Sequence, residues 1–397
     1  MEKAREFLSG LTLRPQGVTL VFAVFLPTLA IMAMFPIIAN MIEHFRSEPG
    51  AAQRVPAMIT APGYAVALLA PIAGLLTDRI GRRRILLSCT FAYGIVGAAP
   101  FLLDDLDAIF VSRLLLGICE AGILTGTTTL IADYWDDRGR RNWLFLQGLI
   151  GPALQPLAFF LVSMGTLVRW NGGFLVYLVA IPVFVAMCLF IHEPARQQSA
   201  APQHTGPAQA APFPYGTMAL VALLTLFVSI IFFVPIIFGS VLWAGIGVSS
   251  PLDVSKYTSV PVLFVLVGAA LFRYCSRFRI AVQMGIVFFL FAVGLAGMAL
   301  AQTVPAMQVS FAIAQTAGGM TFPVFVAWAQ SMFAFEHRGR GMGGWTSAFF
   351  LGQAVSPLVT GPLARVAGSM QEAFLMVGAM ALAAAVVAAM MAQARRA

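Results

Sequence analysis

The chain is long, apolar and sparsely charged. It has 397 residues, of which 60% are apolar and 10% are charged, and its mean hydropathy is +0.88. Because a soluble domain carries about 25% charged residues, this composition excludes a water-soluble enzyme and a disordered chain. The net charge of +8 comes from Lys and Arg scattered without a long basic run, which argues against nucleic acid as a partner. The composition indicates a protein embedded in a lipid bilayer.

Twelve apolar segments are long enough to cross a bilayer. A spanning helix needs about 20 residues, and windows of about 19 residues with low charge predict six spans near 18–42, 56–76, 85–103, 107–131, 143–164 and 172–192. Six more are predicted near 217–240, 257–275, 281–301, 306–332, 342–364 and 371–392. The predicted fold class is an all-α polytopic membrane protein with 12 transmembrane helices.

A proline-rich segment separates the two sets of spans. Its composition, with Pro194, Pro202, Pro207 and Pro212 among Gln and Ala, can build neither a span nor a core. We therefore expect three parts: an N-terminal six-helix half (1–192), a linker (193–216) and a C-terminal six-helix half (217–397).

The distribution of Lys and Arg predicts the orientation. With both termini on one side, that side holds 18 of the 24 Lys and Arg residues and the opposite side holds five. Basic loops are retained in the cytoplasm, so we expect a multi-pass protein of the cell membrane with both termini and the linker cytoplasmic. The first apolar run is too long for the core of a signal peptide and is expected to remain as a span.

The two halves show weak internal symmetry. An Ala-x-x-Val-Ser pattern at 108–112 recurs at 306–310, and Arg-Gly-Arg at 138–140 recurs at 338–340. Two related halves with the same topology are typical of a duplicated transporter, whose substrate site lies between the halves near the bilayer midplane.

The loop between the second and third spans carries the most specific motif. It reads Gly-Leu-Leu-Thr-Asp-Arg-Ile-Gly-Arg-Arg-Arg over residues 74–84. An ordinary basic anchor would explain the arginines but neither Asp78 nor the two glycines. The segment closely resembles the signature loop of the major facilitator superfamily, GxxxDRxGRRR, and we name residues 74–84 the signature loop.

This resemblance implies a fold of two pseudo-symmetric six-helix halves in a monomeric secondary transporter that works by alternating access. It implies a gate on the cytoplasmic side, in which an acid after the fourth span pairs with arginines of the signature loop. The gate residues that it assigns are Gly74, Asp78, Arg79, Gly81, Arg82, Arg83, Asp133 and Arg138. The corresponding loop of the second half has Phe272 in place of the Asp, so the gate is expected to be asymmetric.

The fourth span contains two ionisable residues, Arg113 and Glu120, in a segment similar to the family's RxxxGxxxxG motif with Gly117 and Gly122. A separation of seven residues along a helix returns to nearly the same face, about 10 Å further along the axis. Because that distance is long for a direct ion pair, Arg113 and Glu120 are each expected to have other partners. Ionisable groups in hydrocarbon are costly and usually functional. We therefore predict that Glu120, assisted by Arg113, couples transport to protons; a structural hydrogen bond is the alternative role for Glu120.

Polar residues in the other spans are candidates for the substrate cavity. Gln147, Gln155, Gln315 and Gln353 are assigned to it together with Glu120, and helix packing is the alternative role for each Gln. The fifth span has Gly151 and Pro152 but lacks the glycine pair that ends the family's antiporter motif, which weakens the case for antiport.

Several activities are excluded by missing motifs. The chain has no Walker A sequence and no catalytic signature, and its four His show no metal-ligand spacing, so we expect no enzyme, no metal site and no cofactor. The short length and the remaining motifs look most like the proton-driven drug-efflux branch of the family. The partners expected are a small-molecule substrate, protons and the bilayer. Proton-coupled uptake of a metabolite and a transporter-like sensor remain as alternatives.

Overall fold

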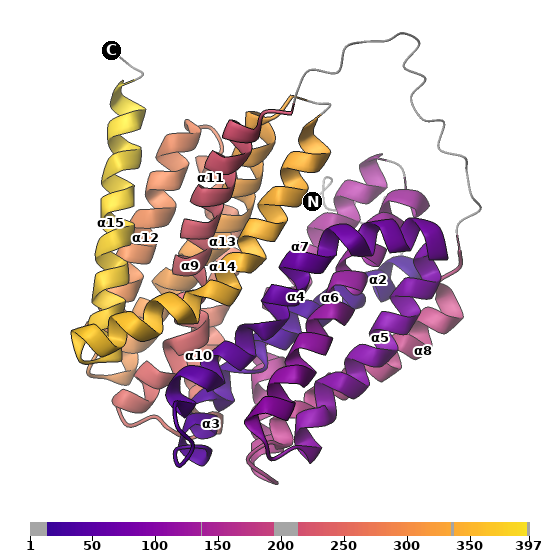
Figure 1. The fold of residues 1–397 in the computed structure, drawn as a ribbon. Helices are drawn as coiled ribbons and strands as arrows, with labels where there is room; N and C mark the ends of the chain where they lie inside the picture. Colours follow the sequence, from indigo (N-terminus) through magenta and orange to yellow (C-terminus); the bar gives the residue numbers. More distant parts are fainter. Residues whose placement is uncertain (1–13, 136, 194–212, 335–336, 395–397) are drawn as a thin grey trace, which may run out of the picture.

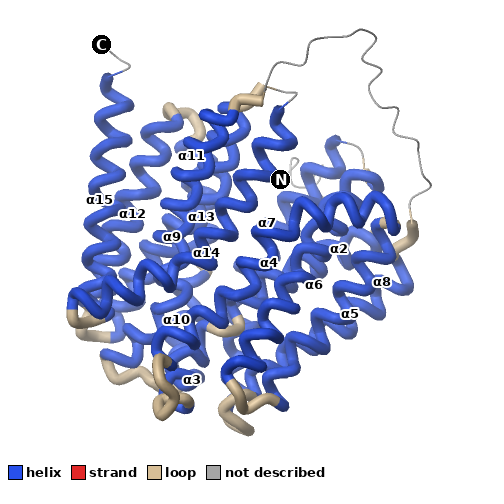
Figure 2. Tube along the Cα trace, in the orientation of Figure 1, coloured by secondary structure: helices blue, strands red, loops and turns tan. Residues whose placement is uncertain are grey.

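The computed structural model describes residues 14–135, 137–193, 213–334 and 337–394, which are almost wholly helical (Figure 2). The N-terminal half contains α2 (Pro15–Met32), η1 (Phe35–Ile37), α3 (Ile38–His44), α4 (Ala51–Ile80), α5 (Arg82–Ala98), η2 (Ala99–Leu102), α6 (Leu106–Tyr134), α7 (Asp137–Thr166), η3 (Gly172–Val179) and α8 (Ala180–Phe190). The C-terminal half contains α9 (Tyr215–Gly245), α10 (Pro251–Val262), α11 (Phe264–Cys275), α12 (Ile280–Leu300), α13 (Val304–Met332), α14 (Arg338–Ala367) and α15 (Met370–Ala394).

These elements make the twelve expected crossings. Ten segments of the described chain are both long and apolar enough to span a membrane. The other two crossings, α4 and α14, are each 30 residues long. The two helices pack against each other where the halves meet.

Three crossings are interrupted. The first changes from α2 through η1 to α3, the sixth begins as the 3₁₀ segment η3, and the eighth divides into α10 and α11 close to Pro261. A proline lacks the N–H that the preceding helical turn would receive. The sequence predicted each crossing as one continuous segment, so these three interruptions are seen only in the structure. The linker also ends earlier than expected, because α9 begins at Tyr215, and residues 194–212 lie outside the described part.

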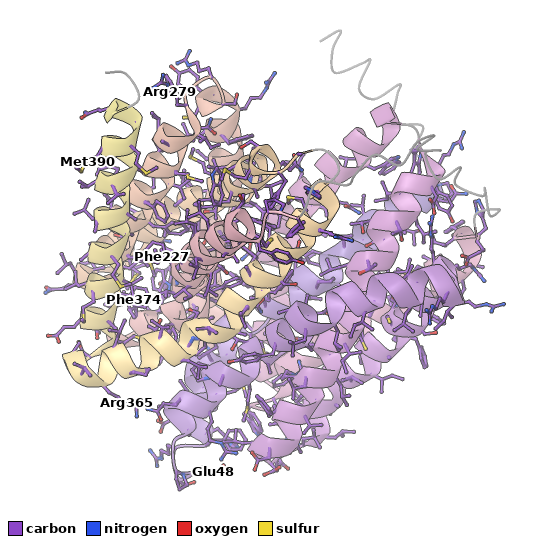
Figure 3. All side chains as sticks on the ribbon, turned by 45° about the horizontal axis from the view of Figure 1, so that its top comes forward. Glu48, Phe227, Arg279, Arg365, Phe374 and Met390 are labelled. Carbon is purple, nitrogen blue, oxygen red and sulfur yellow. The ribbon has the colours of Figure 1, made fainter. Side chains whose placement is uncertain are left out.

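Both ends of the described chain lie on one side of the molecule, which we call the terminal side; the opposite side is the far side (Figure 1). Glu48 and Arg365 lie toward the far side, and Arg279 lies toward the terminal side (Figure 3). Each half has its own hydrophobic core. Phe35 and Phe159 of the N-terminal half pack into the core of the C-terminal half, so the halves share apolar packing.

The two halves contact each other from the middle of the molecule to its far side. The Tyr64 hydroxyl donates to the Ala354 carbonyl at 2.8 Å, linking α4 to α14. The Ser163 hydroxyl donates to the Pro251 carbonyl at 2.9 Å, linking α7 to α10. Phe35 stacks on Phe311 of α13 at 5.6 Å between ring centroids. Toward the terminal side the two groups of helices diverge (Figure 1).

Candidate functional site

The turn between α4 and α5 places the signature loop on the terminal side. Gly81 ends α4 with φ of 111° and precedes α5 directly, a conformation that residues with a Cβ rarely adopt. Arg82 follows this turn and forms an ion pair with Asp133 near the end of α6. The structure thus brings together two residues that the resemblance assigns to the gate. Their role in gating remains a prediction.

A second acid, Glu193, binds the same turn. Its carboxylate accepts the backbone N–H of Arg82 at 2.8 Å and that of Arg83 at 2.9 Å, at the N-terminus of α5. A negative charge is favourable there because the first N–H groups of a helix lack partners within the helix. The Arg83 side chain donates to the carbonyls of Ile191 and Cys188 at the end of α8. The start of the linker is therefore tied to the signature loop.

Tyr134 closes this network from the end of α6. Its hydroxyl donates to the His192 carbonyl, and its ring stacks on the imidazole of His192 at 4.9 Å. Burial raises the pKa of the Tyr134 phenol, which therefore stays protonated and able to donate. Glu193 is an acid that directly follows the sixth predicted span, and no motif in the sequence marks its contact with the signature loop.

Four other predicted gate residues complete the set. The Arg79 side chain is exposed. The side chains of Asp78 and Arg138, and the surroundings of Gly74, lie outside the described part of the structure.

Arg113 is fully enclosed in the N-terminal half, with 1% of its surface exposed. Its Nη2 donates to the carbonyls of Val96 at 3.1 Å and Gly97 at 2.7 Å, both on α5. The guanidinium also lies 5.0 Å from the centroid of the Tyr177 ring and 5.1 Å from that of Phe174. Carbonyl dipoles and ring faces thus stabilise this cation in an apolar interior.

Glu120 lies on the same helix and is also 1% exposed. Among the described residues, its Oε1 has no hydrogen-bond partner and no ion pair joins it to Arg113. Leu116 and Ile123, one turn away on either side, belong to the core of the N-terminal half. The carboxyl group therefore lies inside this half in the described conformation.

The motif glycines hold α6 close to its neighbours. A Cβ on Gly117 would lie 2.6 Å from the Cα of Pro62 and 2.8 Å from the Cβ of Ala65, both on α4. Gly122 faces the Cys89 side chain of α5 in the same way. The spacing of the motif therefore lets α6 pack tightly against two helices at once and fixes the height of Glu120.

The four candidate Gln residues are spread over both halves. Gln155, Gln315 and Gln353 are buried, and Gln147 is partly buried. Gln353 lies closest to the junction: a Cβ on Gly63 of α4 would be 3.3 Å from its Oε1. Neither amide atom of Gln353 has a hydrogen-bond partner in the described chain. Gln147 and Gln155 lie on α7, Gln315 on α13 and Gln353 on α14, and their role in a substrate cavity stays a prediction.

Two cavities in the described chain lie toward the far side. One, of about 290 Å³, lies between the far ends of α4 and α14 and includes Gln53 and Arg365. The other, of about 390 Å³, lies beside α7 and α10 and includes Phe160 and Lys256. Neither is lined by Glu120 or by the four Gln residues. His, Cys, Asp and Glu form no group suited to a metal ion in the part of the chain that the structure describes.

Comparison with known proteins agrees with this architecture. The nucleoside transporter NupG superimposes with a TM-score of 0.76 over 95% of this chain and 98% of that chain, at 14% identity. A bacterial homolog of the human lysosomal transporter Spinster, in an inward-facing and occupied conformation, superimposes with a TM-score of 0.69 over 95% of this chain and 94% of that chain, at 16% identity. At such identities the likeness establishes the fold.

Curated relatives match shorter stretches. A triacylglyceride transporter of Mycolicibacterium smegmatis is 28% identical over 187 residues, which are 46% of this chain and 32% of that protein. The multidrug transporter TPO1_2 of Candida glabrata is 29% identical over 121 residues, which are 30% of this chain and 21% of that protein. This chain thus spans about a third or less of these relatives. The model of the Major Facilitator Superfamily matches residues 20–280 and 250–397, and with the twelve-crossing fold this shows that the chain belongs to that superfamily of transporters.

Proposed function

We propose that this protein is a monomeric secondary active transporter that moves a small amphipathic or weakly polar organic molecule by alternating access, by proton-coupled efflux across the cell membrane. Membership of the superfamily supports transport. The names of the curated relatives, a triacylglyceride transporter and a multidrug transporter, support an apolar or amphipathic cargo. The excess of basic residues on the terminal side supports a cytoplasmic location for both termini.

The observation that carries proton coupling is the environment of Glu120. An ionised carboxylate without a partner is costly in an apolar interior, and Oε1 has none among the described residues. The Nη2 of Arg113 donates to carbonyls of α5, and no hydrogen bond joins this guanidinium to Glu120 among the described residues. We therefore expect Glu120 to hold a proton in this conformation and to release it when movement of the halves admits water or a cation.

The joining of the halves toward the far side supports an inward-open state. If the terminal side is cytoplasmic, the contacts of Tyr64 with Ala354 and of Ser163 with Pro251 close the outer side. In the outward-open state the halves would instead meet at the terminal side. The signature loop, held by Asp133 and Glu193, would then form part of the closed gate.

The test is proton movement in proteoliposomes that contain an internal pH dye. Candidate substrates come first from a thermal-stability screen of the purified protein, because a ligand that binds only the folded state raises its melting temperature. We expect substrate addition to move protons through the wild type and not through Glu120→Gln, which still binds substrate. Glu43→Gln is the control, because Glu43 is exposed and pairs with Arg46 on the far side.

Two outcomes would contradict the proposal. Proton movement by Glu120→Gln at the wild-type ratio to substrate would place the coupling group elsewhere. Wild-type protein that binds substrate but transports none would favour the sensor. Proton flow into vesicles against substrate flow out indicates efflux, whereas flow of both in one direction indicates uptake.

A further inference from the structure

The short turn between α11 and α12 carries a cluster of arginines and aromatic rings. It connects two segments that can each span a membrane, one ending at Cys275 and one beginning at Ile280, so it lies at the bilayer surface on the terminal side (Figure 1). The residues of this cluster, all exposed, are Arg273, Tyr274, Arg277, Phe278 and Arg279. We call these five residues the basic turn.

The rings of the basic turn orient one of its cations. The guanidinium carbon of Arg277 lies 3.8 Å from the centroid of the Tyr274 ring and 5.0 Å from that of Phe278. A guanidinium that stacks on a ring keeps its N–H groups in its own plane, where they can donate to an anion. Among the described residues, none accepts a hydrogen bond from the side chain of Arg277 or Arg273. Oriented donors are therefore available at this surface.

Two hydrogen bonds fix the position of the basic turn. The amide Nε2 of Gln283 donates to the Phe278 carbonyl at 2.8 Å. The Nη1 of Arg279 donates to the Ala392 carbonyl at 3.4 Å, which joins the turn to the end of α15.

The adjoining end of α15 has an apolar outer surface. Near Ala392, the side chains that are more than half exposed are Val387, Met390 and Met391. Met390 and Arg279 are both labelled in Figure 3. Arginines at the bilayer surface beside exposed apolar side chains match a molecule that has an anionic head and an apolar tail.

No acid balances the basic turn in the described part of the C-terminal half. The two described acids of this half, Asp253 and Glu372, lie in the first turns of α10 and α15, on the far side. The corresponding turn of the N-terminal half differs, because Glu193 accepts N–H groups of Arg82 and Arg83 at the start of α5. The start of α12 has no acid in its first turn and no side-chain cap. The second half therefore offers an anion a position that no described residue fills.

We propose that the basic turn binds the phosphate group of an anionic phospholipid, with Arg277 as the oriented donor and the acyl chains along the exposed end of α15. A free anion fits less well, because the turn is an exposed surface, whereas a lipid is already concentrated in the bilayer beside it. This inference concerns the surface that faces the lipid. It does not depend on the substrate, the direction of transport or proton coupling.

The test is lipid binding to the purified full-length protein, measured by native mass spectrometry in a mild detergent. The probes are dioleoylphosphatidylglycerol, which is anionic, and dioleoylphosphatidylcholine, which has the same acyl chains and no net charge. We expect the anionic lipid to bind about tenfold more tightly, because each arginine near the surface attracts its phosphate. Added inorganic phosphate should leave the bound lipid in place.

Three variants separate the oriented cation, its planar shape and general positive charge. Arg277→Gln should weaken binding of the anionic lipid about fivefold. Arg277→Lys keeps the charge without the planar fork and should restore only part of the binding. The matched control is Arg84→Gln, because Arg84 is an exposed arginine on the same side in the other half. Its dissociation constant should stay within about twofold of the wild type, since the two sites are independent.

The proposal is overturned if the two lipids bind equally, if inorganic phosphate displaces the anionic lipid, or if Arg277→Gln and Arg84→Gln lose the same affinity. Displacement would assign the turn to a free anion, and equal losses would indicate attraction by general positive charge. Failure of the proposed function has a different result. A protein that binds the anionic lipid through Arg277 but transports nothing in proteoliposomes would keep this inference and refute transport.

Discussion

Gly117 provides a direct test of how α6 is positioned. In Gly117→Ala the new methyl group would meet the backbone of α4, at the carbonyl oxygen and Cα of Pro62 and at the Cβ of Ala65. Backbone atoms cannot avoid the new methyl group by changing rotamer, as a side chain can. The helices α4 and α6 must therefore move apart. We expect a loss of about 1 to 3 kcal/mol in stability, which is the usual cost of overpacking a well-filled core.

Two other glycines serve as comparisons for the loss of stability expected in Gly117→Ala. Gly122→Ala meets the Cys89 side chain, which can change rotamer, so its cost should be smaller. Gly148→Ala in α7 meets no atom within 4 Å and should be neutral or slightly stabilising, because Ala favours a helix by about 1 kcal/mol over Gly. The measurement is the melting temperature in one detergent, followed by size-exclusion chromatography of heated samples. Equal melting temperatures for Gly117→Ala and Gly148→Ala would refute the close packing of α4 and α6.

Three further predictions concern the terminal side. Glu193→Ala removes the acceptor at the start of α5 and should cost about 1 kcal/mol, seen as a lower melting temperature, whereas Arg84→Ala, at an exposed position, should change little. Asp78→Asn should impair transport at normal membrane insertion, and full transport activity would exclude a gating role for Asp78. Arg82→Gln should reduce transport at equal expression more than Arg340→Gln, because Phe272 replaces the acid in the second half; equal losses would exclude this asymmetry.

Most of the crossings could be predicted because apolar length identifies a spanning segment. Their interruptions could not be predicted in the same way. Pro152 and Pro156 lie inside α7 without ending it, whereas the eighth crossing divides near Pro261. Whether a proline breaks a membrane helix depends on which neighbouring groups can satisfy the freed carbonyls, and that is a property of the packed fold.

The candidate site was predictable to the extent that it follows helix geometry. A rise of about 10 Å between Arg113 and Glu120 predicts separate partners, and the structure gives Arg113 the carbonyls of Val96 and Gly97 on α5. The binding of Glu193 to the start of α5 joins residues 111 and 110 positions apart. No local pattern predicts such a contact, because it requires the ends of α4 and α8 to meet.

The two halves differ in chemistry although they share a fold. The deeply buried ionisable groups, Arg113 and Glu120, belong to α6, whereas the exposed ring of Phe322 belongs to the corresponding helix α13. Corresponding helices of the two halves therefore carry different chemistry at similar positions in the fold. One contact between the halves lies beside α6, where Phe350 of α14 packs on Ala121, the residue after Glu120.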